Sequence, residues 1–474
     1  MRVKLIVVAG PHEGREFSFS EHDNFIVGRG KQAHFRLSMK DPYFSRIHFM
    51  VEVNPPVCRL MDMQSTNGTV VNSRRVKRSD LSDGDVIGGG DTKIRVSIEV
   101  GQPLSPEQTI APPKRNRALD GPGGNRASDA TLAPPTGKAE RALERLVRES
   151  DRARQKNSAT PPPNVEPASQ GLESTADMPA GCEVLPNDYE EMIRNSPQPI
   201  AGYQIIKEIG RGAMGVVYLA LSIAGNAVVA LKMIKPAVEA SREDLVRFSR
   251  EASILKSLSH PSIVAFRDMG ESDGMLYFAM DYVQGQDASK LVRSHGELFS
   301  VWRAVNIACQ MLEALEYAHG QGFVHRDIKP ANLMVAEHDG REVAVLSDFG
   351  LARHYHASKL SGLTMMGDVA GTTPYMPPEQ ITHYRDAKPT VDQYAAAATL
   401  YFLLTKKHIY DFPHDVSQQL MMILQKAPVP IEERRSDIPK RLAEIVHRGL
   451  TREPADRFGD VGEMRAELLG FCGS

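Results

Sequence analysis

Cysteine is scarce in this sequence, and its scarcity limits the kinds of protein that the chain can be. The 474 residues contain four cysteines with no CxxC or Cys/His spacing, at positions Cys58, Cys182, Cys309 and Cys472. This distribution argues against a disulfide framework or a zinc site. It favours reduced thiols, and we therefore expect a cytoplasmic protein.

Long hydrophobic runs and an excess of one charge are also lacking. The first residues, MRVKLIVVAG, hold an apolar run of only about six residues, which predicts a β-strand and not a signal peptide. The later run Ala395–Leu404 is too short to cross a bilayer. The formal net charge of −2 gives no general attraction to nucleic acid or anionic lipid. We expect neither a membrane anchor nor a nucleic-acid partner.

Composition divides the chain into three parts, as its length suggests. Residues 1–100 alternate short β-type runs with turn signals, which predicts an all-β sandwich. Residues 101–198 are rich in Pro, Ser, Thr and Gly and poor in aromatics, which predicts a disordered linker. Residues 199–474 begin with β-type segments and continue with helical ones, which predicts a two-lobed α+β domain.

One segment of the linker has a helical pattern. Ala139, Ala142, Leu143, Leu146 and Val147 recur at helical spacing among many charges, which predicts a short amphipathic helix over residues 137–157. It is either a marginal solvated helix, or a helix that docks on a lobe or pairs with another copy.

The third part contains four short motifs in a fixed order. Glycines in the segment 210–217, GRGAMGVV, would let a hairpin approach phosphates closely. Lys232 lies in an apolar strand, where a buried ammonium needs an anionic partner such as Glu251. HRDIKPAN at 325–332 and DFG at 348–350 follow. Each motif alone could be an ordinary turn or loop.

Together these motifs resemble a serine/threonine protein kinase domain, similar to bacterial kinases of eukaryotic type, over about residues 202–470. The resemblance implies ATP-dependent phosphoryl transfer, which needs neutralised charge and aligned oxygens more than covalent help. It implies that Lys232, fixed by Glu251, holds the α- and β-phosphates. Asp327 would accept the proton of the substrate hydroxyl, and Lys329 would neutralise the transferred phosphoryl group.

The resemblance also implies the cofactor sites. Asn332 and Asp348 would supply oxygen ligands to Mg²⁺. Met280 would be the gatekeeper of the adenine pocket. The nucleotide-binding residues would be Gly210, Arg211, Gly212, Ala213, Met214, Gly215, Val217, Ala230, Lys232, Asp281, Val283 and Met334.

Departures from the family pattern lie away from the phosphates. The usual Ala-Pro-Glu reads Pro-Pro-Glu, which keeps Glu379 as the expected partner of Arg457. Downstream, Ala397 and Lys406 replace customary glycines. We expect these changes to alter packing and to leave the chemistry intact.

The activation loop between Gly350 and Glu379 predicts regulation by phosphorylation. Arg326, next to Asp327, would bind a phosphate on this loop through charge-assisted hydrogen bonds. Thr364 matches the usual phosphosite best, ahead of Ser358 and Ser361. Thr372 matches a threonine that contacts the catalytic loop, which implies a structural role.

Residues 1–100 carry a second set of motifs: VGR at 27–29, SRIH at 45–48, STNGT at 65–69 and DGDVIG at 83–88. Together they resemble a forkhead-associated (FHA) domain, an eleven-stranded β-sandwich that binds phosphothreonine with loops at one end. The resemblance assigns the phosphopeptide to Arg29, Ser45, Arg46, Thr66 and Asn67, and it makes His48 part of the loop architecture. An arginine with hydroxyl and amide donors suits a phosphate dianion.

Two functions follow from these resemblances. The first is a signal-transducing serine/threonine kinase that phosphorylates proteins, itself included, and recruits phosphothreonine partners. The alternative is a phosphothreonine-binding scaffold with a vestigial kinase domain. Retention of Lys232, Asp327, Asn332 and Asp348 favours the kinase.

The linker repeats one short pattern, QTIAPP at 108–113 and ATLAPP at 130–135. In both copies a proline lies three residues after the threonine, a position that FHA domains read. Thr109 and Thr131 are therefore candidate autophosphorylation sites and FHA ligands. The alternative is low-complexity drift in a Pro-rich linker.

Overall fold

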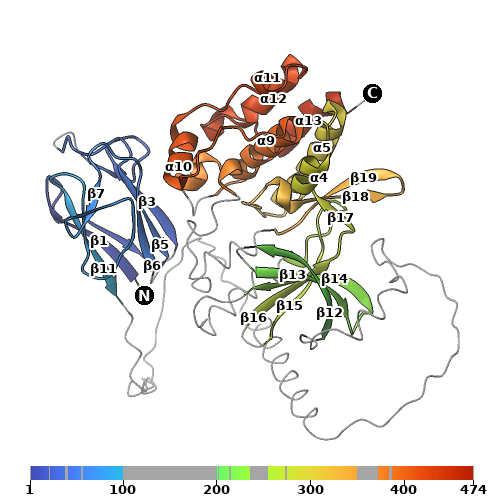
Figure 1. The fold of residues 1–474 in the computed structure, drawn as a ribbon, viewed down its shortest axis with the longest axis horizontal. Helices are drawn as coiled ribbons and strands as arrows, with labels where there is room; N and C mark the ends of the chain where they lie inside the picture. The colour runs from blue at the N-terminus through green and yellow to red at the C-terminus, as the bar shows by residue number, and fades with distance from the viewer. Residues whose placement is uncertain are drawn as a thin grey trace, which may run out of the picture. The chain divides into compact units, whose positions relative to one another are not determined.

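The structure is a computed structural model and is shown in Figure 1. It describes residues 2–20, 22–37, 41–54, 57–99, 200, 202–212, 215–234, 255–272, 275–349, 372–383 and 387–472. The expected linker and its helix lie outside the described residues. So do Ala213, Met214, Glu251 and Thr364.

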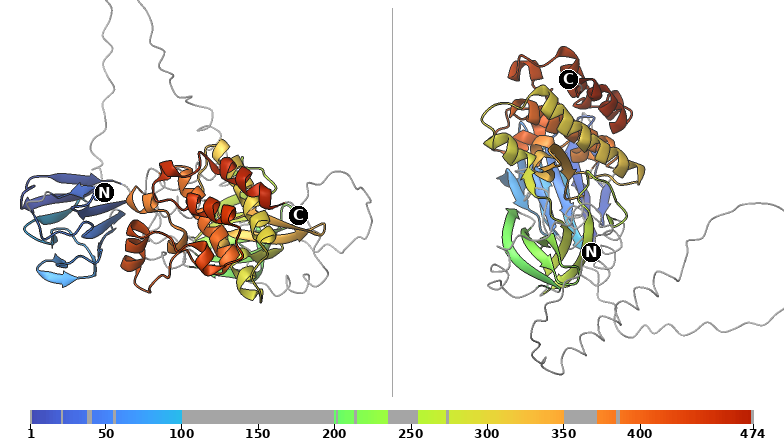
Figure 2. Two further views of the ribbon diagram at one scale, coloured as in Figure 1. Left: turned by 90° about the horizontal axis from the view of Figure 1, so that it is seen from above. Right: turned by 90° about the vertical axis from the view of Figure 1, so that its right-hand side faces the viewer.

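Residues 2–99 fold as two β-sheets, and the described part of this region has eleven strands, as expected for the FHA sandwich (Figure 2). The six-stranded sheet has the order β2-β1-β11-β10-β7-β8, and the five-stranded sheet has the order β4-β3-β5-β6-β9. The strands are β1 (Arg2–Ala9), β2 (Glu16–Phe19), β3 (Asp23–Gly28), β4 (Phe35–Arg36), β5 (Phe49–Asn54), β6 (Val57–Asp62), β7 (Thr69–Val71), β8 (Arg74–Val76), β9 (Arg78–Asp80), β10 (Val86–Gly88) and β11 (Lys93–Glu99).

The sandwich core follows the period of two that strands impose on their side chains. Val3, Leu5 and Val7 alternate along β1 and are fully buried or nearly so. They join one apolar cluster with residues of the opposite sheet, such as Phe49 and Val51 of β5. Burial of these side chains between the two sheets stabilises the sandwich.

The register of the five-stranded sheet brings three loops to one end. Val27, near the end of β3, pairs with Phe49, the first residue of β5. Phe49 pairs in turn with Asp62, the last residue of β6. The segments that follow β3, precede β5 and follow β6 therefore meet, and they carry the predicted phosphopeptide residues.

The kinase-like part begins with a five-stranded antiparallel sheet of order β12-β13-β14-β16-β15. Its strands are β12 (Tyr203–Gly212), β13 (Gly215–Ser222), β14 (Ala227–Ile234), β15 (Phe266–Ser272) and β16 (Met275–Asp281). After it comes a small three-stranded sheet of β17 (Gly285–Asp287), β18 (Leu333–His338) and β19 (Arg341–Leu346).

A helical lobe follows the five-stranded sheet, so the expected two-lobed α+β plan is observed (Figure 1). The α-helices of the described residues are α4 (Ala288–Ser294), α5 (Val301–Gly320), α8 (Pro378–Thr382), α9 (Thr390–Thr405), α10 (Val416–Gln425), α11 (Ile431–Arg434), α12 (Lys440–Gly449) and α13 (Val461–Leu468). Short 3₁₀ turns are η1 (Pro330–Asn332), η3 (Thr373–Tyr375), η5 (Pro454–Asp456) and η6 (Leu469–Phe471).

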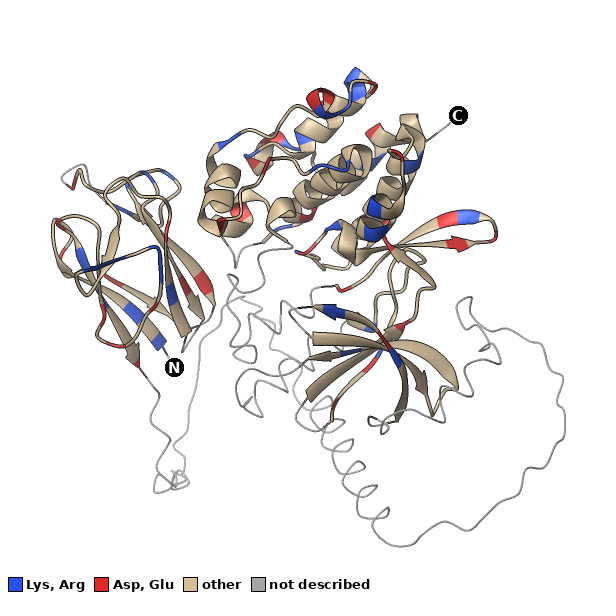
Figure 3. Ribbon diagram, in the orientation of Figure 1, with Lys and Arg blue, Asp and Glu red and all other residues tan. Residues whose placement is uncertain are grey.

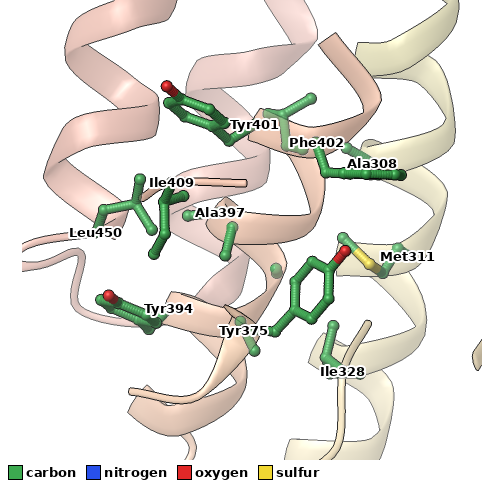
Figure 4. Close-up of a cluster of buried hydrophobic side chains, with 14 of the residues drawn as sticks. Ala308, Met311, Ile328, Tyr375, Tyr394, Ala397, Tyr401, Phe402, Ile409 and Leu450 are labelled. Carbon is green, nitrogen blue, oxygen red and sulfur yellow. The ribbon is translucent and has the colours of Figure 1, made fainter. Parts of the chain in front are cut away.

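Helix α9 is the centre of the helical lobe. Fifteen of its sixteen residues, Val391–Thr405, are buried, and its one charged residue is Asp392 (Figure 3). Tyr394, Ala397, Tyr401 and Phe402 of α9 pack in the core shown in Figure 4, with Met311 of α5 beside them. A helix that is apolar all round must be buried, which explains this central place.

No helix in the described part of the chain is long and apolar enough to cross a membrane.

Candidate functional site

The catalytic-loop segment, residues 325–332, is held in place by the buried carboxylate of Asp392. The backbone N–H of His325 donates to Asp392 Oδ2 and that of Arg326 donates to Oδ1, each at 2.7 Å. His319 Nε2 of α5 lies 2.8 Å from Oδ2. Arg326 has a φ of 65°, a conformation that side-chain-bearing residues rarely adopt. These hydrogen bonds stabilise a strained backbone next to Asp327.

The side chains of Asp327, Lys329 and Asn332 lie together, as the family pattern implies. Lys329 Nζ is 3.0 Å from Asp327 Oδ2. Asn332 Nδ2 donates to the same Oδ2 at 3.0 Å and to the Asp327 carbonyl at 2.8 Å. Lys329 Nζ also donates to Thr372 Oγ1 at 2.9 Å. Thr372 therefore contacts the catalytic loop.

The hairpin of β18 and β19 brings the two expected metal ligands near each other. Leu333 pairs with Leu346, and the Ser347 N–H donates to the Asn332 carbonyl at 2.9 Å. Asp348 follows directly with a φ of 58°. His325 connects this segment to the catalytic loop, because its Nε2 lies 3.0 Å from the Ser347 carbonyl and its ring lies 4.6 Å from that of Phe349.

Lys232 reaches across to this segment. Its Nζ lies 2.7 Å from Asp348 Oδ1, so the small lobe and the DFG segment are joined by an ion pair. Glu251 lies outside the described residues, and its pairing with Lys232 remains a prediction. The predicted phosphate-binding lysine and the predicted metal-binding aspartate are thus brought together.

The predicted nucleotide residues share one face of the five-stranded sheet. Val217 pairs with Lys232, and Ala230 pairs with Met280. Directly opposed residues point to the same face, as do residues two apart on one strand. Val217, Ala230, Lys232 and Met280 therefore lie on one side of the sheet.

Other predicted nucleotide residues lie on the neighbouring strands and segments. Gly210 and Gly212 end β12, and Gly215 begins β13, so they form the predicted glycine-rich hairpin. Arg211, within this hairpin, is exposed and donates to Glu208 through Nη2 at 2.6 Å. The other predicted members are Asp281 at the end of β16, Val283 just after it, and Met334 on β18, opposite Asp287.

The donor set fits Mg²⁺. The amide nitrogen of Asn332 is used by Asp327, so its amide oxygen is the atom left for a cation, beside the carboxylate of Asp348. Mg²⁺ prefers oxygen ligands and usually takes one or two carboxylates together with phosphate oxygens. No group of three or more His, Cys, Asp and Glu residues that could hold a metal occurs among the residues described. The site therefore suits Mg²⁺ brought with a nucleotide.

The predicted pair of Glu379 and Arg457 is confirmed. Arg457 Nη1 lies 2.6 Å from Glu379 Oε1, and Nη2 lies 2.9 Å from Oε2. The guanidinium lies 5.1 Å above the ring of Tyr394, and burial holds the pKa of that tyrosine well above its usual value. A buried bidentate pair of this kind connects α8 to the segment before α13.

The FHA-like loops bring most of the predicted phosphopeptide residues into one hydrogen-bonded group. Ser45 Oγ accepts from the Thr66 N–H at 2.9 Å and lies 3.3 Å from Thr66 Oγ1. The Arg29 N–H donates to the Ser45 carbonyl at 3.0 Å. Asn67 Nδ2 donates to the Tyr43 carbonyl at 2.7 Å. Arginine, hydroxyl and amide donors from three loops therefore gather at one end of the sandwich.

Arg46 joins this group through its backbone. The Gly30 N–H donates to the Arg46 carbonyl at 2.7 Å, and the Arg46 side chain is exposed. A Cβ built at Gly28 would lie 2.4 Å from the same carbonyl oxygen. The glycine of the VGR motif is therefore needed for this close approach of two loops.

Two buried residues support the loops from beneath. His48 is fully buried, accepts from the Ser45 N–H through Nδ1 at 3.1 Å, and lies 3.3 Å from the Gly68 carbonyl through Nε2. Burial lowers the pKa of His48, so the ring is neutral and can do both. Asp62 accepts from the Thr69 hydroxyl at 2.6 Å and from the Ser65 N–H at 3.1 Å.

Comparison with known families agrees with both resemblances. A protein kinase domain family matches residues 203–467, and an FHA domain family matches residues 25–90. The first match covers more than half of the chain. The chain belongs to the protein kinase family, as a bacterial-type serine/threonine kinase with an N-terminal FHA domain.

Several kinases of Mycobacterium tuberculosis are among the similar proteins. Serine/threonine-protein kinase PknD is 35% identical over 264 residues, which is 55% of this chain and 38% of PknD. Serine/threonine-protein kinase PknF is 36% identical over 281 residues, which is 58% of this chain and 57% of PknF. The crystal structure of the PknI kinase domain is 32% identical, with a TM-score of 0.46, and covers 59% of this chain and 98% of that domain. The chain thus spans between about two fifths and three fifths of these curated relatives.

Proposed function

We propose that this chain transfers the γ-phosphate of ATP to serine and threonine hydroxyls of proteins. The observation that carries the proposal is the Asp327 carboxylate held by Lys329 at 3.0 Å and by Asn332 at 3.0 Å. A carboxylate fixed in this way accepts the hydroxyl proton while the new oxygen–phosphorus bond forms and ADP leaves. The Lys329 ammonium offsets the charge of the transferred group.

The remaining residues of the site hold the nucleotide. Lys232 is placed to bind phosphate oxygens, and the strand face of Val217 and Ala230 is placed to hold the adenine. Asn332 and Asp348 would hold Mg²⁺, which neutralises phosphate charge when bound. Positioning and electrostatic stabilisation supply the catalysis.

The FHA domain is proposed to bind phosphothreonine. Arg29, Ser45 and Thr66 contact the phosphate, Arg46 adds positive charge, and Asn67 holds the peptide backbone beyond the threonine. The support is the hydrogen-bonded group of three loops described above. Its ligands are partner proteins and the chain's own linker, phosphorylated at Thr109 and Thr131.

The catalytic proposal is tested with purified protein, Mg-ATP labelled at the γ-phosphate, and a generic protein substrate. Lys232→Met and Asp327→Asn should each lower incorporation by about a hundredfold or more. Lys407→Met, which changes an exposed lysine after α9, should keep full activity. Equal incorporation by the two site variants and the parent would contradict the assignment, and a parent without incorporation would favour the scaffold alternative.

A further inference from the structure

A second arginine lies beside the phosphothreonine site. Arg75 of β8 is opposite Val70 of β7, and its exposed side chain turns back over Gly68 of the STNGT segment. A Cβ built at Gly68 would lie 2.2 Å from Arg75 Nε and 2.6 Å from Cζ. Gly68 also has a φ of 79°, which favours glycine. The glycine therefore makes the room that the guanidinium occupies.

The Arg75 guanidinium has no carboxylate partner within the described part of residues 2–99. The ion pairs in this region that join lysine or arginine to an acid are Lys4 with Glu99 and Arg59 with Asp80. Gly68 is two residues from Thr66, so the guanidinium lies within about 7 Å of the expected phosphate contacts along the loop. An exposed cation at that distance from a phosphopeptide is placed to bind a second anionic group of the same ligand.

The two linker repeats share an acidic residue as well as the threonine and the prolines. Glu107 precedes Thr109 by two residues, and Asp129 precedes Thr131 by two. In an extended peptide, side chains two residues apart point to the same side and lie roughly 7 Å apart. A carboxylate at this position therefore faces the same surface as the phosphate, at a spacing that matches Thr66 and Gly68.

We propose that Arg75 binds the carboxylate two residues before the phosphothreonine. The ligand class of this FHA domain is then a phosphothreonine peptide with Asp or Glu at that position, as in both linker repeats. This inference rests on the proposed phosphothreonine binding and adds a specificity residue to it.

The test uses the full chain with Asp327→Asn, so that its own threonines stay unphosphorylated. Fluorescent peptides spanning residues 104–115 are prepared with phosphorylated Thr109, either with Glu107 or with Glu107→Gln. The acidic peptide should bind about two- to fivefold more tightly at low salt, as expected for an exposed ion pair. Arg75→Gln should abolish this ratio while leaving binding of the Glu107→Gln peptide nearly unchanged.

Two further variants sharpen the result. Arg74→Gln, which changes the neighbouring exposed arginine of β8, should keep the ratio. Arg75→Glu should invert it, so that a Glu107→Lys peptide binds more tightly than the acidic one. An Arg75→Gln variant that keeps the parent ratio, or a parent with no ratio, overturns the inference. If no phosphorylated peptide binds better than its unphosphorylated form, phosphothreonine binding itself is wrong and the inference falls with it.

Discussion

Several of the residues that matter most in this molecule act by holding another residue in place. Asp392 makes no expected contact with nucleotide, yet its carboxylate accepts the backbone N–H groups of both His325 and Arg326 at 2.7 Å. His48 likewise supports Ser45 and Gly68 from beneath the phosphopeptide loops. Buried polar groups with satisfied partners of this kind fix the geometry of exposed sites.

The pH dependence of His48 is a prediction at the residue scale. Burial lowers the pKa of His48 below its ordinary value of 6.5. The unfolded chain therefore binds a proton more readily than the folded domain, so the stability that His48 contributes is present above pH 6.5 and is lost as the pH falls through the lower, folded pKa. An NMR titration of the His48 ring should show it still neutral at pH 6.5. A ring that is mostly protonated at that pH would contradict the hydrogen-bonding role given to Nδ1 and Nε2.

Lys406 gives a second prediction at the residue scale. It ends α9 with a φ of 57°, where helices usually place glycine. Lys406→Gly should relieve this strain and raise the free energy of unfolding by about 0.5–1 kcal/mol, allowing for the greater freedom of glycine in the unfolded chain. Thermal unfolding measures the change. Lys407→Gly, at the next position, lacks a left-handed backbone and should not stabilise; equal effects of both changes would refute the explanation.

At the scale of elements, the activation loop carries a further prediction. Arg326 begins the catalytic Asp327 segment, and Thr364 is the residue of the loop that best matches a phosphosite. Thr364→Ala should lower the turnover rate by about tenfold, equivalent to about 1.4 kcal/mol of lost charge-assisted hydrogen bonding. The KM for ATP should change little, because the nucleotide contacts lie elsewhere. Full activity in Thr364→Ala, with phosphate on Ser358 or Ser361, would move the assignment within the loop.

The elements also show what could be predicted from the sequence. Short motifs such as HRDIKPAN contain their own chemistry, and the clustering of Asp327, Lys329 and Asn332 was predictable because they lie within one loop. The support that Asp392 gives and the position of Arg75 over Gly68 were not predicted, since each depends on a contact between separate elements. A single acid in the apolar run of α9 was the available signal for Asp392. For Asp62, the signal was an acid three residues before Ser65, the spacing of a side-chain-capped turn.

At the scale of the whole molecule, the register of the FHA sandwich separates the two linker threonines. Gly88 pairs with both Val70 and Lys93, so β11 begins at the end of the sandwich that carries the phosphopeptide loops. It runs to Glu99, roughly 20 Å away at the opposite end. The linker therefore starts on the far side from the binding site.

Reach then decides which threonine can bind its own domain. Thr109 follows residue 100 by nine positions and can extend at most about 31 Å. It would have to round a domain of roughly 33 Å and still lie extended in the site. Thr131 follows by thirty-one positions and reaches easily. We expect phosphorylated Thr131 to bind within one molecule and phosphorylated Thr109 to join two.

This expectation is measured by analytical ultracentrifugation of the phosphorylated chain. Thr131→Ala should leave Thr109 to drive concentration-dependent association, and Thr109→Ala should give a monomer. Arg29→Ala should abolish association in both backgrounds. Association that survives Arg29→Ala would show that the linker threonines do not bind through the FHA site.

The central claim is that one chain both writes and reads phosphothreonine, and a phosphosite map tests its first half most directly. The full chain is incubated with Mg-ATP and compared by mass spectrometry with Asp327→Asn treated identically. The account predicts phosphate on threonines of the active chain, including Thr109, Thr131 and Thr364, and none on Asp327→Asn. A parent chain that remains unphosphorylated, or a variant phosphorylated at the same sites to the same extent, would contradict it.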